Sequence, residues 1–228
     1  MSIFNSTNNT CPRCGETVEI SWAASVNAVR RPDLRAAILD RSFQAEDCPA
    51  CGLKMRLPPH LTYVDMNKGN WILVEGFDEM PHWEAHEAEA KQLFDEAFGA
   101  TAPASNRELA EGVSPRLVFG WPALREKILA TELGLDDATL ELLKIAVIRS
   151  VPGAPLADGR GLRLVGGDAA TLKLEITDDA TEETFGATDV PRSLYDDIAG
   201  DTAAWAPLRA KLSDVALVDL QRFTLVGA

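Results

Sequence analysis

Apolar and polar residues alternate along several segments of the first 80 positions, and this period of two predicts β-strands. The first segment runs from Thr17 to Trp22, and two more run from Leu61 to Asp65 and from Trp71 to Glu75. The last two are separated by five residues that include two Asn and one Gly, which tolerate the positive φ of a tight turn. Pro32, followed by apolar residues at helical spacing up to Leu39, predicts a short inserted helix. The N-terminal part is therefore expected to be mainly β.

A spacing of three to four residues between apolar positions predicts helices in the middle of the chain. An acidic amphipathic helix is expected over 81–98, where Leu93, Phe94 and Phe98 share one side. A helical hairpin is expected over 121–150, with Gly134 at the end of its first helix. The run of Ala, Thr, Pro, Ser and Asn between Gly99 and Pro115 is typical of a linker.

Alternation resumes after a loop over 151–161 that is rich in Pro and Gly. It predicts a second β-hairpin, with strands at Leu162 to Leu164 and Leu172 to Ile176 joined near Gly166. The other expected elements are a strand at Arg116–Phe119, helices at Pro191–Ile198 and Ala203–Leu212, and strands at Val215–Val218 and Phe223–Val226.

Composition and charge restrict the class of protein. The 228 residues carry 22 basic and 35 acidic side chains, a formal net charge of −13. That sign opposes binding to phosphate backbones or anionic lipid, so nucleic acid is not expected as the main partner. The most apolar stretch, Leu140 to Val151, is interrupted by three charged residues, and the polar first ten residues do not resemble a secretory signal. We therefore expect a cytoplasmic protein without a membrane segment.

Four cysteines carry the strongest chemical signal. They occur in two copies of Cys-Pro-x-Cys-Gly, as the pairs Cys11 and Cys14, and Cys48 and Cys51. Two intervening residues allow one turn to present both sulfurs of a pair to one ion, and four thiolates are the ligand set that Zn²⁺ prefers in closed tetrahedral sites. The following Gly is expected to let the backbone fold back toward the sulfurs where a side chain would interfere. Arg13 and Lys54 are the nearest basic candidates for balancing the charge of such a site.

Two alternatives to a structural zinc site remain open. Cys-Pro-x-Cys also resembles the active site of thioredoxin-like oxidoreductases, in which the first cysteine gains reactivity at a helix N-terminus. Here two pairs occur, and each is followed by Gly and by β-forming residues, which argues against that chemistry. The cysteines could also be unligated and packed as small hydrophobic residues.

At these motifs the sequence resembles the CpXC family of uncharacterised prokaryotic proteins, named after paired Cys-Pro-x-Cys motifs. The similarity covers about residues 9 to 150 and extends past the cysteines. The segments that carry it include Pro32-Asp33-Leu34, Arg56-Leu57-Pro58, Val118-Phe119-Gly120 and Glu141-Leu142-Leu143-Lys144. The resemblance implies a metal-binding domain without an assigned activity.

The histidines and the acidic segments give weaker signals. His82 and His86 stand four residues apart on the acidic helix with Glu89 one turn further, so the three could hold a second divalent ion, although such a pair is usually solvated. Residues 75–98 contain eight acids and one base, and a second acidic segment covers 178–201. Such runs are typical of solvated faces and could alternatively meet a basic protein surface.

Together these features predict an α+β protein. It has an N-terminal zinc-ribbon-like β unit with an inserted helix, central helices and a C-terminal mixed α/β segment, with divisions at 1–100, 101–150 and 151–228. The expected function is non-catalytic: a Zn²⁺-stabilised scaffold that binds another protein, within a larger bacterial assembly, in an oligomeric state that the sequence leaves open. Trp71, Trp83 and Trp121 are candidate contacts, although packing in the core is the expected use of each. The alternatives are a nucleic-acid-associated ribbon, which needs a basic stripe at Arg30, Arg31 and Arg35, and a thiol oxidoreductase.

Overall fold

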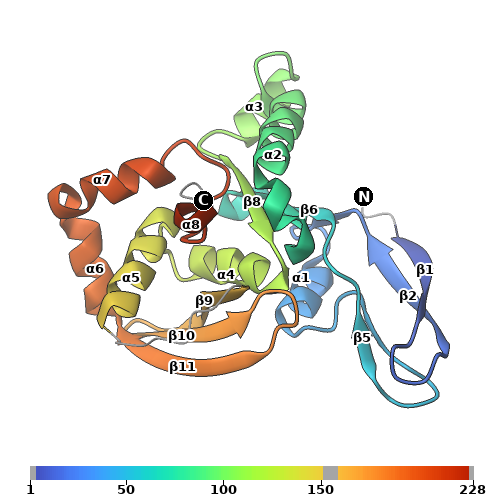
Figure 1. Ribbon diagram of the computed structural model, residues 1–228. Coiled ribbons are helices and arrows are strands. Elements are labelled where there is room, and N and C mark those ends of the chain that lie inside the picture. The colour runs from blue at the N-terminus through green and yellow to red at the C-terminus, as the bar shows by residue number, and fades with distance from the viewer. Residues whose placement is uncertain (1–3, 151–158, 226–228) are drawn as a thin grey trace.

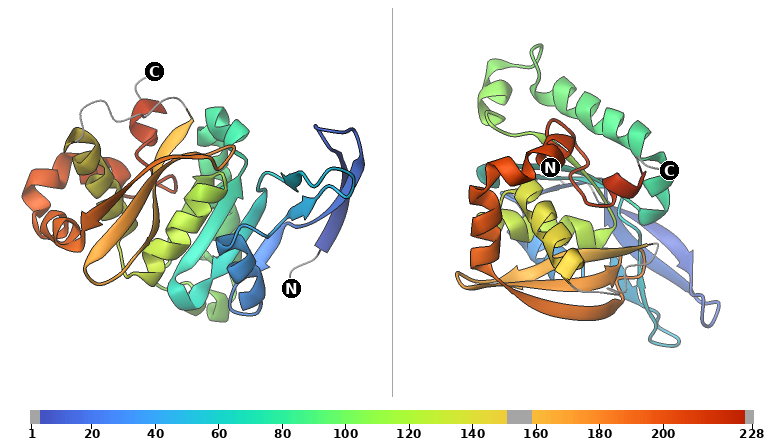
Figure 2. Two further views of the ribbon diagram at one scale, coloured as in Figure 1. Left: turned by 90° about the horizontal axis from the view of Figure 1, so that it is seen from below. Right: turned by 60° about the vertical axis from the view of Figure 1, so that its left-hand side comes forward.

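The computed structural model describes residues 4–150 and 159–225 and contains three parts, which Figure 1 shows side by side. Two short hairpins form an N-terminal unit that extends away from the rest (Figure 2). A four-stranded mixed sheet with helices on both faces lies in the centre, and a three-stranded antiparallel sheet with its own helices forms the far side. The fold is therefore mixed α+β, as the sequence predicts.

The N-terminal unit consists of two antiparallel pairs of strands. β1 (Phe4–Thr10) pairs with β2 (Thr17–Ala23), and β4 (Ala45–Asp47) pairs with β5 (Lys54–Arg56). The sequence did not predict β1, because its residues are polar apart from Phe4; it forms through backbone pairing with β2 along its whole length. The buried cluster of this unit consists of two cysteines together with Val18 and Ile20, whereas Ala23 at the end of β2 packs in the central core. So few buried side chains are too small a core to hold two hairpins together.

The central sheet has the strand order β3-β6-β7-β8. β6 (Leu61–Asp65) and β7 (Asn70–Glu75) form the predicted antiparallel hairpin, with Gly69 at a φ of 72° in its turn. β3 (Ser25–Asn27) and β8 (Pro115–Phe119) pair in parallel with its two sides. The sheet therefore extends across the predicted division at residue 100.

Helices cover both faces of this sheet. α1 (Pro32–Leu39) and α4 (Trp121–Glu132) pack against one face, whereas the predicted acidic helix, observed as α2 (Trp83–Phe98) after the 3-10 helix η2 (Phe77–His82), packs against the other. The predicted linker is wrong in part, because it contains α3 (Ala104–Leu109). Asn106 in α3 donates a hydrogen bond to the carbonyl of Ala97 at 3.2 Å, which holds this segment against α2.

The C-terminal part is a meander of β9 (Arg160–Gly167), β10 (Thr171–Asp178) and β11 (Thr184–Pro191). The predicted hairpin corresponds to β9 and β10. Helices α5 (Asp137–Ser150), α6 (Arg192–Gly200) and α7 (Thr202–Leu212) pack beside this sheet in one apolar cluster. Most of the predicted 151–161 loop lies outside the described residues.

Two predicted strands at the C-terminus are wrong. The segment Val215–Val218 is buried without forming a strand, and α8 (Arg222–Leu225) occupies the position of the last predicted strand, whose end lies outside the described residues. Buried side-chain acceptors bind the segment instead: Glu87 accepts hydrogen bonds from the amides of Ala216 and Leu217 at 2.8 and 3.0 Å. The apolar run alone cannot distinguish this arrangement from a buried strand, because both bury consecutive apolar residues, here Ala216, Leu217 and Val218.

A fully buried network of ion pairs connects the central and C-terminal parts. Lys144 Nζ lies 2.6 Å from Glu126 and 2.8 Å from Glu141, and none of the three side chains is exposed. Arg163 is 2% exposed and binds Asp179 through two hydrogen bonds of 2.9 and 2.6 Å.

The same network reaches the C-terminal segment. The second carboxylate oxygen of Glu141 accepts a hydrogen bond from the amide of Leu220 at 2.9 Å, and Arg163 also binds Asp219. Although burial opposes its charge, the neighbouring carboxylates keep the pKa of Arg163 well above its usual value. The network thus holds Arg163 and its carboxylate partners where water cannot solvate the charge of either.

Glu182, in the turn between β10 and β11, connects the N-terminal unit to the rest. Its carboxylate lies 2.6 Å from Arg56 at the end of β5 and also binds Arg125 of α4. The guanidinium of Arg56 lies over the Trp121 ring, 4.2 Å from its centroid. The Glu182 side chain is 13% exposed, so this part of the second acidic segment is partly buried and paired, contrary to the expectation of a solvated face.

Among the described residues, no helix combines the length and apolar character that crossing a bilayer requires.

Replacing the central cation of the buried network is expected to destabilise the whole molecule. Lys144→Met removes the nearest cation from two buried carboxylates, and breaking a buried pair in this way costs about 3–5 kcal/mol of unfolding free energy. Equilibrium denaturation in urea measures this loss. Lys173→Met, on an exposed position of β10, is the matched control and should change the stability little. A loss below about 1 kcal/mol for Lys144→Met would contradict the role given to the network.

Candidate metal centre

The two Cys-Pro-x-Cys-Gly motifs fold into equivalent turns at the ends of the two N-terminal hairpins. In the first, between β1 and β2, the amide of Gly15 donates to the carbonyl of Cys11 at 2.9 Å. In the second, between β4 and β5, the amide of Gly52 donates to the carbonyl of Cys48 at 2.8 Å. The Cys-Pro-x-Cys-Gly motif thus forms the same backbone hydrogen bond in both hairpins.

The glycines in these turns are required for their backbone conformation. Gly15 has a φ of 77° and Gly52 a φ of 68°, which side chains rarely adopt. A Cβ added at either position would meet no atom within 4 Å. The expected steric interference with a side chain is therefore wrong, and positive φ alone explains the glycine.

The folding of the two turns brings all four sulfurs together. The Sγ atoms of Cys11 and Cys51 are 3.6 Å apart and those of Cys14 and Cys48 are 3.5 Å apart. All four lie within 4.8 Å of one another. Tetrahedral coordination with Zn–S bonds of about 2.3 Å requires sulfur separations of about 3.8 Å. The sulfur cluster therefore has the dimensions of a closed four-ligand metal site.

The protonation of the sulfurs also favours a cation among them. Burial opposes ionisation of Cys11, but hydrogen bonds from the amides of Arg13 and Cys14 and from neighbouring thiols lower its pKa to about 6. The backbone near Glu16 would lower the pKa of Cys14, but burial and the three other sulfurs raise it to about 12. Without a cation, the four sulfurs cannot all be thiolates together. A divalent ion removes this conflict, because it neutralises the repulsion between them.

The geometry argues against the other two interpretations of the cysteines. All four are free, and the shortest sulfur separations far exceed the bond length of a disulfide, about 2.05 Å. Each pair lies in a turn between strands and not at the start of a helix, so the arrangement that activates thioredoxin-like cysteines is not formed here. Four converging sulfurs also differ from cysteines scattered through an apolar core.

The basic residues near the motifs have different surroundings. Arg13 donates to the carbonyl of Cys51 at 3.5 Å and so bridges the two turns, whereas Lys54 is exposed. Of the arginines proposed as a basic stripe, Arg31 pairs with Asp33 and Arg35 pairs with Glu132. These pairs neutralise most of the charge that nucleic-acid binding at this position would need.

The candidate second metal group has a different composition from the one the sequence predicts. His86 and Glu89 lie together as predicted, but the third residue of their group is Glu75 of β7, and not His82. His82 lies 3.3 Å from Glu79 and is largely exposed. Glu75 could not be identified from helical spacing, because it reaches the group from a strand on which it is the last residue.

Most of the tryptophans predicted as candidate contacts with a partner protein belong to the core. Trp71 is 5% exposed and Trp121 is 4% exposed, and Trp121 donates to the carbonyl of Leu57 at 2.9 Å. Trp83 is half-buried beneath the guanidinium of Arg222. Packing, the expected use, is therefore the one observed for Trp71 and Trp121.

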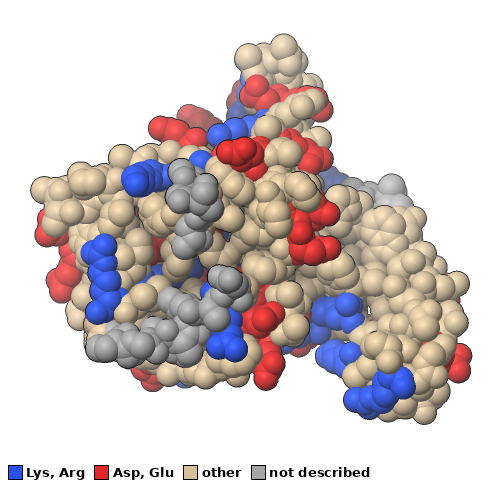
Figure 3. All heavy atoms as spheres, viewed as in Figure 1, with Lys and Arg blue, Asp and Glu red and all other residues tan. Residues whose placement is uncertain are grey.

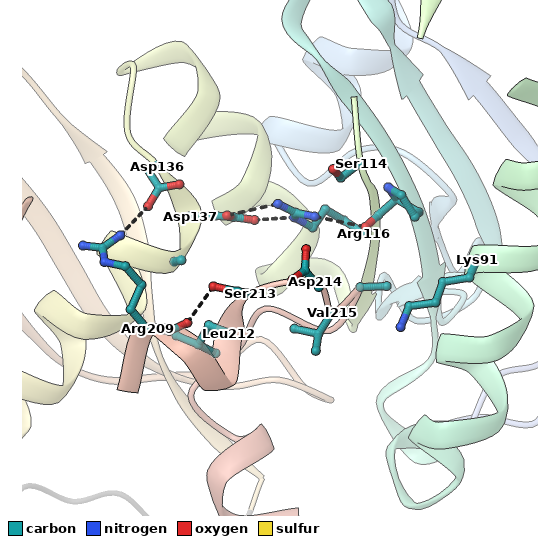
Figure 4. A pocket seen from close by; sticks show the side chains of 13 residues that line it. Lys91, Ser114, Arg116, Asp136, Asp137, Arg209, Leu212, Ser213, Asp214 and Val215 are labelled. Atoms are coloured by element: carbon teal, nitrogen blue, oxygen red, sulfur yellow. Dashed lines mark hydrogen bonds and ion pairs between the residues drawn. The ribbon is translucent and has the colours of Figure 1, made fainter. Parts of the chain in front are cut away.

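A polar pocket of about 420 Å³ lies between β8, α5 and the end of α7 (Figure 4). Four of its charged groups bind one another in pairs: Arg116 forms two hydrogen bonds with Asp137, the shorter at 2.6 Å, and Arg209 lies 3.5 Å from Asp136. Lys91 and Asp214 also line the pocket.

The fold and the sulfur cluster define an α+β protein with a four-cysteine group that can hold a metal ion. The chain belongs to the CpXC family, because the model of that family, described as CpXC protein, matches residues 10–144. The match covers the N-terminal unit from the end of β1, the central sheet and most of the helical hairpin, and ends at Lys144 in the buried network. No curated protein and no solved structure matches the chain.

Metal removal is expected to unfold the N-terminal unit selectively. Chelation, or Cys48→Ser, should expose the amides of β1, β2, β4 and β5 to exchange and leave β9 and β10 less affected, because only the former depend on the sulfur cluster. Hydrogen–deuterium exchange with mass spectrometry measures both regions in one experiment. Ala50→Ser, an exposed change in the same turn, is the control and should retain wild-type protection. Unchanged exchange in the N-terminal hairpins after verified metal loss would contradict this account.

The ion pair in the pocket should make stability depend on acid pH. Burial disfavours the charge of Asp137, but Lys127 and Arg116 lower its pKa to about 2. Since the folded-state pKa lies below the unfolded value, this contribution is complete above pH 4 and is lost as the pH falls from about 4 to 2. It amounts to about 2 kcal/mol for a shift of nearly two units. Asp137→Asn should therefore show a smaller loss of stability over this interval in denaturant titrations, and an unchanged acid dependence would refute the assignment.

Proposed function

We propose that this protein is a non-catalytic module in which Zn²⁺ stabilises the N-terminal unit so that it can bind another protein, as a component or accessory of a larger assembly. The observation that carries the proposal is the closed sulfur cluster at the ends of two hairpins that extend from the body (Figures 1 and 2). Four protein sulfurs fill tetrahedral coordination and leave no position for a substrate, which is typical of structural zinc.

The ligand type supports zinc in preference to other ions. Thiolates are soft ligands, which disfavours Mg²⁺ and Ca²⁺, and the sulfur separations agree with those of tetrahedral zinc thiolate sites. Free cysteines that must be reduced to bind the ion also fit the reducing cytoplasm, where we place the protein.

The surface at β1 and at the neighbouring segment between β3 and α1 has features suited to binding a protein. Phe4 of β1 is 44% exposed and Val29 of that segment is 48% exposed, and the guanidinium of Arg31 lies over the Phe4 ring. Among the described strands β1 pairs only with β2, so its other edge offers backbone groups to an extended segment of a partner. Exposed apolar side chains beside a free strand edge favour docking of a polypeptide.

Charge is distributed unevenly over the molecule in a way that also favours a protein partner. Residues 1–60 contain seven bases and six acids, whereas the rest of the chain is strongly acidic. Figure 3 shows basic side chains gathered on the N-terminal unit near β5 and acidic ones along and below α2. An acidic partner protein would be repelled by the acidic body. It would not be repelled by the nearly neutral N-terminal part.

Affinity capture from the native host tests this proposal. The wild-type protein should retain a specific partner in stoichiometric amount, and Phe4→Ser with Val29→Ser should weaken its retention at least tenfold while zinc content and thermal stability remain unchanged. Leu109→Ser, which removes an exposed apolar side chain from α3 outside the unit, is the matched control and should retain the partner. Retention that survives both the double change and Cys48→Ser would overturn the proposed surface, and zinc below one equivalent per chain would overturn the proposed metal.

A further inference from the structure

A second set of metal-ligating side chains lies on the opposite side of the central sheet from α4, where α2 packs against β7. One ligand atom from each of Glu75, His86 and Glu89 lies within 4.8 Å of the other two. Glu75 shares a face of β7 with Trp71 and Leu73, which contact α2, so strand alternation directs its carboxylate toward the helix. His86 and Glu89 are three residues apart on α2 and share one face of it.

Two atoms in this group are buried and lack a hydrogen-bond partner. Glu75 is 3% exposed, and its Oε1 has none. The Nδ1 of His86 is also buried without a hydrogen bond, although it lies 3.4 Å from Oε2 of Glu89. A buried carboxylate oxygen and a buried imidazole nitrogen with no partner normally destabilise a folded protein, so their convergence requires an explanation.

Neighbouring residues hold the other polar atoms of these two side chains. His60 Nδ1 lies 2.6 Å from Oε2 of Glu75, so Oε1 remains available. Glu79 of η2 lies 3.4 Å from Nε2 of His86 and can accept a hydrogen bond from it, and in that tautomer the Nδ1 lone pair is available to an ion. A carboxylate that binds the far nitrogen of a ligating histidine is a recurrent feature of protein metal sites.

The ring of His86 is also held in place by packing. It meets Phe119 of β8 edge to face, with centroids 6.0 Å apart and an angle of 77°. Phe119 is also the residue of β8 that pairs with Glu75 of β7. Phe119 therefore helps to position both His86 and Glu75. The separation of 3.4 Å between His86 Nδ1 and Glu89 Oε2 lies within the range of about 3 to 3.5 Å that ligand bonds near 2.1 Å require.

We propose that Glu75, His86 and Glu89 form a second metal site for a hydrated first-row divalent cation. One imidazole and two carboxylates form a nitrogen and oxygen ligand set, which suits Mn²⁺ or Zn²⁺ and not the soft ions that thiolates select. Because Glu89 is half-exposed, the remaining coordination positions face water, in contrast to the closed sulfur cluster. The bound ion joins α2 to the end of β7 and neutralises the buried Glu75.

Mn²⁺ binding to the zinc-loaded protein tests this site, because Mn²⁺ competes poorly for thiolates and its free form is measured by electron paramagnetic resonance. We expect one Mn²⁺ per chain. His86→Ala and Glu89→Gln should each raise the dissociation constant at least tenfold. Glu89 is exposed, so its replacement leaves the fold intact and keeps the test valid if His86→Ala proves unstable.

Two controls separate this site from general attraction of cations to the acidic helix. Glu96→Gln removes an exposed carboxylate from the same helix, and His82→Ala removes the histidine that lies outside the group. Both should bind Mn²⁺ within twofold of the wild type. No saturable binding at millimolar Mn²⁺, or equal weakening by Glu96→Gln and Glu89→Gln, would overturn the proposal.

Discussion

The buried pairing of Lys144 and Arg163 with carboxylates is the interaction on which the body of the molecule depends. Neither cation is reached by water, so each requires carboxylates delivered from several segments at once. Glu126 comes from α4, Asp179 from the turn after β10, and Asp219 from the segment between α7 and α8. These segments can therefore not separate without exposing unpaired charge, and the central sheet, the C-terminal sheet and the terminal segment are held as one body.

The N-terminal unit is stabilised by a different physical means. Its hairpins bury few side chains, and two of those are cysteines. A unit of this size gains little from burial, and under the proposed function an ion bound to the sulfur cluster would supply the stability that the core lacks. Connection to the body is made mainly through Arg56, which binds Glu182 and stacks on Trp121. The molecule thus combines a body stabilised by buried ion pairs with a unit whose four sulfurs can hold a metal ion.

In both parts, charged or polar side chains lie at interior positions where apolar residues would ordinarily be expected. Some residues of the acidic segments occupy such positions. Glu87 in the acidic helix is buried and paired, and Glu182 in the second acidic segment is partly buried and paired. The proposed second metal site follows the same principle, since Oε1 of the buried Glu75 has no hydrogen-bond partner. The pattern of charge along the sequence predicts that acidic residues are exposed, and it does not identify these exceptions.

The sequence by itself determined the features that depend on local spacing. The duplicated tetrapeptide predicted that all four sulfurs could serve one ion, because a Cys-Pro-x-Cys turn fixes each pair locally, and the β6–β7 hairpin and most helices followed from apolar periods. Only the tertiary structure decided the rest. The polar strand β1 exists because β2 offers its backbone a partner, and the C-terminal segment is not a strand because Glu87 binds its amides. Glu75 lies near His86 for a similar reason, because contacts between a strand and a helix depend on how the two pack. The apolar period of the strand or of the helix alone does not predict such contacts.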